Sequence, residues 1–232
     1  MALVQYGGGI LDARGSIGGQ VHSKNRFGNY IRARTTPVNP KSSRQNLIRA
    51  IIQMLAQYWS NTLTQLQRDG WEVYAAAITR QNKLGAQIKL TGFNHFIRSN
   101  SAYIQAGETV VAAPPTTLTL PTADPLFACT VDEAAQQISV VFDDTLAWNT
   151  QDGGLLIVSM SIPKAAGNNF IGGPTRLASA IVGIDPGGVA SPQVMAVPFP
   201  VAEGQEIVCS ARIAELDGRL SDPFRDQSSV TA

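Results

Sequence analysis

Apolar residues recur at helical spacing in three stretches of the first half of the chain. In residues 43–59 they follow the 3.6-residue period of an amphipathic helix. The same period predicts a second helix over 65–80 and a third that begins near Thr91 and stops at Gly107. Gly70 should weaken the second helix, because glycine costs about 1 kcal/mol relative to alanine in a helix interior.

Beyond residue 125 the apolar period shortens to two, which is the spacing of β-strands. The strands are predicted at 126–131, 136–142, 154–161, 176–184, 193–199 and 206–215, with a last one after the Asp217-Gly218 turn. About seven short antiparallel strands in about 110 residues are typical of an immunoglobulin-like or fibronectin-like sandwich. Residues 126–232 are therefore predicted to form an antiparallel β-sandwich domain.

The start of the chain is glycine-rich and basic, and its apolar residues are too few for a core. The segments QVHSK and NYIRART, around the turn NRFG, predict a β-hairpin over 20–35. Tyr30, Arg32 and Arg34 would share one face of it, which is therefore cationic. Residues 7–19 are expected to be a flexible lead. A lone hairpin is marginal in water, so it needs a partner sheet, a helix or a neighbouring subunit.

The chain is thus predicted to be an α+β protein built of four consecutive segments. Pro37 and Pro40 should hold the backbone extended before the first helix. Four prolines between residues 114 and 125 indicate a semi-rigid connector. The predicted segments are an extended basic arm with a β-hairpin (1–45), a helical region of three helices (46–112), a proline-rich linker (113–125) and the β-sandwich (126–232).

Composition fits a globular protein: 232 residues with 44% hydrophobic content can bury one large or two modest cores. No run approaches the roughly 20 apolar residues that a membrane-spanning helix needs. The first residues lack a basic lead and a long apolar run, so no secretory signal is expected. The two cysteines, Cys129 and Cys209, allow one bridge or two buried thiols.

Charge is distributed unevenly although the net charge is only +1. Residues 1–113 hold 13 basic and 4 acidic residues, a net +9, whereas residues 114–232 hold 5 and 13, a net −8. Such halves suit head-to-tail association, or a basic end that faces nucleic acid or an acidic surface. The plainer alternative is two domains of different ancestry with ordinary solvated charges.

Motifs for enzymatic chemistry are missing. The segment GSIGGQVHSK has the glycines of a phosphate loop, but no lysine follows them directly and a strand follows instead of a helix. No serine lies in a Gly-x-Ser-x-Gly elbow. The adjacent Asp143 and Asp144 would point to opposite faces of a strand and cannot flank one glycosidic bond. We therefore expect no enzyme activity and no cofactor.

A metal site is not expected either. Metal sites need clustered ligands, whereas His22, His95, Cys129 and Cys209 fall in separate predicted elements. The acidic residues of DGRLSDPFRD lack the spacing of an EF-hand and are interrupted by arginines.

The basic arm is the candidate binding site. Its side chains would bind either the phosphates of nucleic acid, with Phe27 and Tyr30 stacking on bases, or the carboxylates and carbonyls of a partner protein. The protein partner is favoured, because the second half of the same molecule is acidic. The candidate partner-binding residues are Arg14, Lys24, Arg26, Tyr30, Arg32, Arg34, Lys41 and Arg44.

Several segments are familiar in this order: GNYIRARTTPVNPKSSRQNLIRA, YWSNTLTQLQRDGW, LTGFNHFIRSN, GGLLIVSMS, GGPTR and DGRLSDPFRD. The chain resembles, over nearly its whole length, a group of tailed-phage and prophage proteins regarded as virion structural components. The resemblance implies a place in a phage particle and leaves head, neck and tail open.

From this resemblance and the arm we expect a capsid decoration (cement) or head-tail connector-region protein. It would be made in the host cytoplasm, assemble into the virion as a homo-oligomer and bind other virion proteins, with no membrane contact. The alternatives are an arm that lies on packaged DNA, and an adhesin-like tail component that binds carbohydrate, the latter by fold analogy alone.

Overall fold

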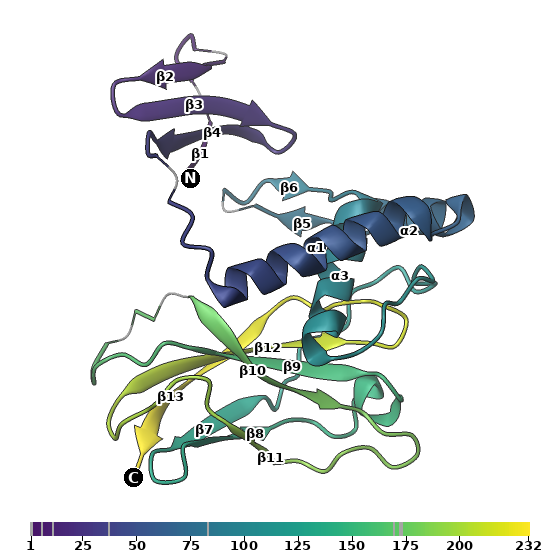
Figure 1. The fold of residues 1–232 in the computed structure, drawn as a ribbon, viewed down its shortest axis with the longest axis vertical. Helices are drawn as coiled ribbons and strands as arrows, with labels where there is room; N and C mark the ends of the chain where they lie inside the picture. The colour runs from purple at the N-terminus through teal and green to yellow at the C-terminus, as the bar shows by residue number, and fades with distance from the viewer. Residues whose placement is uncertain are drawn as a thin grey trace.

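A computed structural model describes residues 2–5, 7–10, 12–36, 38–82, 84–168, 170–171 and 174–232. Three parts are stacked along the longest axis: a small N-terminal sheet, a layer of helices and a large C-terminal sheet (Figure 1). Helices combined with mostly antiparallel strands make this an α+β fold, as predicted. Pro37, for which an extended backbone was predicted, lies outside the described residues.

Three α-helices are present in the described residues, and local capping chemistry determines where they begin. They are α1 (Ser43–Asn61), α2 (Gln65–Ala77) and α3 (Gly92–Ala106). The side chains of Ser42, Thr64 and Thr91 accept hydrogen bonds from backbone N–H groups of the first turns, as N-caps do. Gly107 ends α3 in the left-handed conformation. The predicted starts of all three helices are therefore confirmed.

The second helix is shorter than predicted. It ends at Ala77, because Arg80 belongs to a two-stranded ribbon of β5 (Arg80–Gln81) and β6 (Gln87–Ile88). The side chain of Asn82 accepts hydrogen bonds from the N–H groups of Leu84 and Ala86 and so shapes the turn of this ribbon.

Gly70 is explained by tertiary packing. A Cβ atom at this position would lie 2.4 Å from Cγ of Pro114, which belongs to the proline-rich segment. Glycine lowers the helix propensity at this position, but its missing side chain allows the proline-rich segment to pack directly on the backbone of α2.

We expect Gly70→Ala to destabilise the protein by about 1–3 kcal/mol, because the overlap with Pro114 outweighs the gain in helix propensity of about 1 kcal/mol. Urea unfolding followed by circular dichroism measures the change. Pro114→Gly removes the overlapping atoms, so in that background Gly70→Ala should become stabilising. If Gly70→Ala destabilises equally in both backgrounds, the overlap is not the cause.

The N-terminal sheet contains the predicted hairpin and two further strands. Its strands are β1 (Ala2–Val4), β2 (Gly15–Ile17), β3 (Gln20–Asn25) and β4 (Gly28–Ala33), in the order β1-β4-β3-β2. The strands β3 and β4 form the hairpin predicted over 20–35. The prediction of a flexible lead over 7–19 was wrong in part, because β2 lies inside it and pairs with β3.

The C-terminal sheet has seven strands among the described residues, one for each predicted strand. They are β7 (Ala128–Asp132), β8 (Gln137–Val141), β9 (Leu155–Ser161), β10 (Thr175–Val182), β11 (Gln193–Ala196), β12 (Glu206–Ala214) and β13 (Phe224–Thr231). A short 3-10 helix, η1 (Ala147–Thr150), precedes β9.

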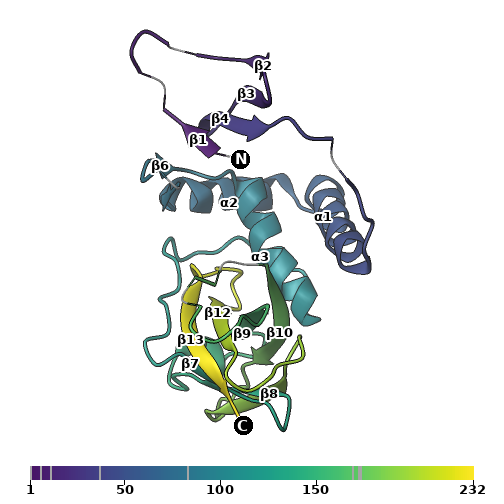
Figure 2. The same ribbon diagram turned by 90° about the vertical axis from the view of Figure 1, so that its left-hand side faces the viewer.

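These strands form one curled, barrel-like sheet in the order β10-β9-β12-β13-β7-β8-β11. All neighbours are antiparallel except β13 and β7, which pair in parallel at Val230 and Thr231. The edge strands β10 and β11 contact each other, so the sheet nearly closes (Figure 2). Its interior is lined by a large apolar cluster that includes Ile138, Trp148, Met160 and Ile207.

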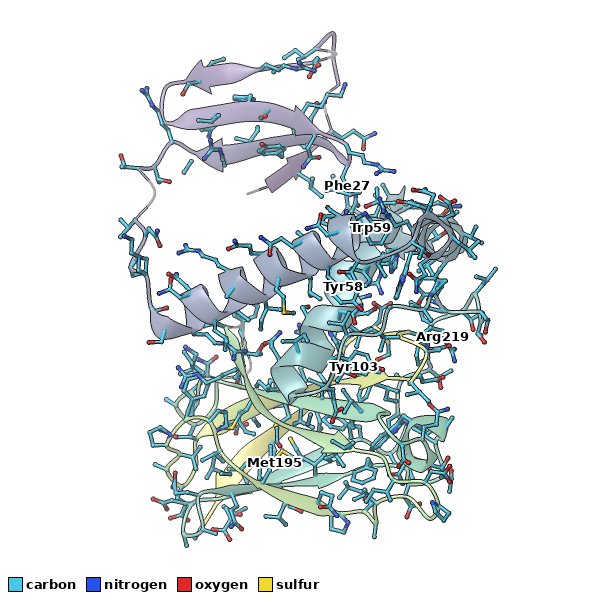
Figure 3. All side chains as sticks on the ribbon, turned by 45° about the vertical axis from the view of Figure 1, so that its right-hand side comes forward. Phe27, Tyr58, Trp59, Tyr103, Met195 and Arg219 are labelled. Atoms are coloured by element: carbon cyan, nitrogen blue, oxygen red, sulfur yellow. The ribbon has the colours of Figure 1, made fainter. Side chains whose placement is uncertain are left out.

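Two smaller apolar clusters join the helices to one another and to the C-terminal sheet. Leu55, Trp71 and Phe96 are fully buried between the helices, next to the labelled Tyr58 and Trp59 (Figure 3). On the outer face of the C-terminal sheet, Tyr103 of α3 packs on residues such as Leu155. The proline-rich connector is packed too, because Pro115 and Pro121 are buried and Leu120 packs on the cluster that contains Trp71.

Candidate functional site

The N-terminal sheet has no core of its own. Among the described residues before α1, no side chain is buried. Apolar side chains are left in solvent, with exposed fractions of 55% for Ile10, 70% for Ile17 and 87% for Val38. Burial of apolar surface is the main stabilising contribution to folding, and this sheet has little of it. The sheet is therefore a candidate binding surface.

Strand pairing places Tyr30 and Arg32 on one face of the sheet, whereas Arg34, predicted to share that face, follows the end of β4 at Ala33. Leu3 and Ser23 are the partners of Tyr30, and Val21 is the partner of Arg32. Because side chains alternate along a strand, Tyr30 and Arg32 share a face with these partners, as the sequence predicted. An aromatic ring and a guanidinium group flanked by small and apolar residues suit a protein surface or a base as the contact.

Two of the predicted residues are paired within the sheet. Asp12 carboxylate oxygen Oδ2 lies 3.6 Å from Arg14 Nε and 3.7 Å from Lys24 Nζ. Exposed pairs of this kind contribute little to stability. Within the described part of the chain, Arg32 and Arg34 have no ion pair, so their charges remain available.

The remaining predicted residues are spread over the base of the sheet. Arg26 and Phe27, at the turn between β3 and β4, line a hollow with Gln87 and Lys89 of the ribbon, and Figure 3 shows Phe27 on the side nearest the helices. Lys41 directly precedes the N-cap of α1. Arg44 points the other way, because its Nη2 donates a 2.6 Å hydrogen bond to Gln105 Oε1 of α3. The predicted partner-binding residues therefore do not form one continuous surface: some lie on the N-terminal sheet, some at its turn and some at the start of α1.

Both edges of the N-terminal sheet are open. In the described residues no strand pairs with the outer side of β1 or of β2, each of which has only three residues. Unpaired N–H and C=O groups on a sheet edge accept an added strand from another chain. The sheet edge is a second way in which this part of the molecule could join a partner.

The acidic residues of DGRLSDPFRD do not converge on one point. Asp217 pairs with Arg219 at 2.7 Å, Asp222 pairs with Arg80 at 2.5 Å, and Asp226 accepts a hydrogen bond from the Cys129 N–H. No group of metal-binding side chains is present in the described residues.

Cys129 and Cys209 are buried as free thiols inside the C-terminal sheet. A hydrogen bond to Cys209 and burial raise the pKa of the Cys129 thiol far above its ordinary value. A thiol that stays protonated is a poor nucleophile and a poor metal ligand. These cysteines are therefore core residues.

Sequence reasoning missed a second cationic cluster beneath the helices. Arg80, Arg98 and Arg212 come from β5, α3 and β12 and share the single carboxylate of Asp222, which is 3.5 Å from Arg98 Nη2. Burial, followed by repulsion from Arg80, lowers the pKa of Arg98 to about 10 and also lowers the pKa of Arg212. These arginines are far apart in the sequence, so no local pattern predicts that they cluster. The only indication in the sequence is an arginine within otherwise apolar elements such as β12.

Comparison of the chain with protein-family models, curated proteins and solved structures found no match. None of the helices in the described part of the chain combines the length and apolar character needed to cross a bilayer.

Proposed function

We propose that this protein is a non-enzymatic structural component of a tailed-phage virion, of the capsid decoration (cement) or head-tail connector type. It joins neighbouring subunits through its N-terminal sheet. The observation that carries the proposal is the lack of any buried side chain in that sheet among the described residues, combined with its open edges and cationic face. A sheet of this kind is completed by a partner.

A protein partner is favoured over nucleic acid. Residues 1–113 carry a net +9 and residues 114–232 a net −8, so the basic end of one copy complements the acidic end of the next. The C-terminal sheet lies at the opposite end of the molecule from the N-terminal sheet, which suits head-to-tail contact or contact with an acidic capsid or connector protein (Figure 1).

The strand order supports the finer assignment of residues 126–232 to an immunoglobulin-like or fibronectin-like sandwich. One layer would hold β10, β9, β12 and β13 and the other β7, β8 and β11, with the short parallel pairing at Val230 as the link between them. In the particle this domain would project outward. An experimental structure in which β10 and β11 are hydrogen-bonded, so that the sheet closes into a barrel, would contradict the assignment.

Deleting residues 1–40 tests the proposal directly. The shortened chain keeps Lys41 and the N-cap Ser42, so α1 can still begin at Ser43. Because the deleted residues contribute nothing to the three apolar clusters, we expect the melting temperature to stay close to that of the full chain. Incorporation into particles, measured by co-sedimentation with virions produced in cells, should be lost.

Point variants complete the experiment. Arg32→Glu reverses a charge on the N-terminal sheet and should reduce incorporation of the protein into particles. Arg225→Glu makes the same change at an exposed residue of β13 and serves as the control. Normal incorporation of the shortened chain would refute the proposal.

DNA remains the second candidate, favoured by the unpaired charges of Arg32 and Arg34 beside Tyr30. If the arm lies on packaged DNA, the full chain binds duplex DNA with a steep salt dependence that Arg32→Gln with Arg34→Gln abolishes. Absence of binding at low salt eliminates this candidate and leaves the protein partner.

A further inference from the structure

A pocket of about 270 Å³ lies where the start of α1, the middle of α3 and the outer face of the C-terminal sheet meet. Three guanidinium groups line it, from Arg44, Arg98 and Arg212. The pairing of Ser210 with Ser159 places two hydroxyl groups side by side on the sheet that forms its floor. The pocket therefore offers many hydrogen-bond donors in a small space.

Positive charge in and behind this pocket is not balanced by the protein. Arg80 lies close enough to Arg98 and Arg212 to lower the pKa of both groups. Across the described residues the ion pairs of this cluster involve Asp222 alone, which contacts Arg80 and Arg98. The guanidinium groups of Arg44 and Arg212 have no ion pair with any described residue. Like charges held together at a half-buried site cost stability unless an anion joins them.

Arg212 is the clearest sign of a missing partner. It projects from β12 beside Ile157, on the sheet face that α3 covers with apolar contacts. In the described part of the chain its guanidinium group makes no ion pair and no hydrogen bond, although the residue is only half-exposed. An apolar side chain would pack there at lower cost, so packing alone does not explain an arginine.

Further donors around the cluster are also unused. The hydroxyl groups of Ser159 and Ser210 have no hydrogen bond to any described residue. Arg80 lies near Arg98 and Arg212 but does not line the pocket, and its Nε and Nη2 are buried without a hydrogen-bond partner in the described residues. The unused hydroxyl and guanidinium donors that do line the pocket suit a ligand rich in acceptor oxygens.

We propose that this pocket binds a phosphate group, either as inorganic phosphate or as a small phosphate monoester. A dianion with three or four acceptor oxygens matches the surplus charge and the mixed guanidinium and hydroxyl donors better than a single carboxylate does. Because Arg44 belongs to the first turn of α1, the bound phosphate also fastens this helix to the C-terminal sheet.

Isothermal titration calorimetry of the full chain tests the site, with inorganic phosphate, phenyl phosphate and acetate at matched ionic strength. The expected result is saturable binding of at least one of the two phosphate ligands and no comparable binding of acetate. Saturable binding of both phosphate ligands would mean that the pocket has room for the organic group of a monoester. Saturable binding of inorganic phosphate alone would mean that it does not. Equal binding of acetate would overturn the assignment to phosphate.

Arg212→Gln should weaken phosphate binding at least about tenfold, because it removes a charge-assisted hydrogen bond. Without phosphate this variant should melt no lower than the unchanged protein, since it removes a repelling charge. Arg225→Gln, an exposed arginine of β13, is the matched control and should bind normally. No saturable phosphate binding, or unchanged affinity in Arg212→Gln, would overturn the proposal. Neither result bears on the assembly role of the N-terminal sheet.

Discussion

Replacing Trp71 with alanine should lower the free energy of unfolding by about 4 kcal/mol, because a large buried aromatic side chain leaves a cavity that cannot collapse. Trp71 is fully buried, and its ring centroid lies 5.6 Å from that of Phe96 in an edge-to-face contact. The change also leaves the carbonyl oxygen of Ala112 without its 3.2 Å hydrogen bond from the indole N–H. Urea unfolding followed by far-UV circular dichroism measures the loss.

Two further variants separate the causes. Trp71→Phe keeps an aromatic ring but not the N–H group, so its loss should be intermediate. Leu66→Ala changes a residue of the same helix that is 81% exposed, and it should alter the stability by less than about 0.5 kcal/mol. If Trp71→Ala lowers the free energy of unfolding no more than Leu66→Ala does, Trp71 does not stabilise the packing of the helices.

Acid should destabilise the protein through His95. Burial, followed by repulsion from Arg80 and Arg98, lowers the pKa of His95 to about 4 from its ordinary 6.5. As the pH falls, the unfolded chain therefore takes up this proton before the folded chain does, and stability present above pH 6.5 is lost towards pH 4. Between pH 7 and pH 5 the loss from His95 alone should be about 2 kcal/mol.

The measurement compares urea unfolding at pH 7 and pH 5 in the unchanged protein and in His95→Gln. The variant cannot take up the proton, so its stability should fall by about 2 kcal/mol less over this interval. Leu66→Ala, which changes an exposed residue and no ionisable group, is the control, and over this interval it should lose as much stability as the unchanged protein. An equal fall in His95→Gln would mean that His95 is not the group responsible.

Local chemistry made most secondary structure predictable. Ser42, Thr64 and Thr91 each cap a helix with their own side chains, so the signal lies within four residues of the start of each helix. The seven strands of the C-terminal sheet were found because one side of each strand faces a core, which imposes a period of two. The short strands β1 and β2 have no fully buried side chain among the described residues, so they show no such period and were not predicted.

The binding surfaces were less predictable, because they depend on residues brought together by the fold. Tyr30 and Arg32 share a strand, so their common face could be deduced from alternation alone. Arg44 was assigned to the arm by its position in the chain, yet its side chain reaches α3 and lines the pocket with Arg212. Gly70, similarly, is explained only by Pro114.

The pairing of strands also sets an order of events during synthesis. In the N-terminal sheet Ala2 pairs with Ile31, so all strands of this sheet are available before most of the chain has been synthesised. In the C-terminal sheet Val131 of β7 pairs with Val230, which is synthesised about 100 residues later. Until then this edge of β7 is unpaired, and nascent chains can associate through it incorrectly. The segment that we propose to bind partners is thus synthesised before the stable body of the molecule, and because it buries no side chain of its own among the described residues, it should gain stability on docking.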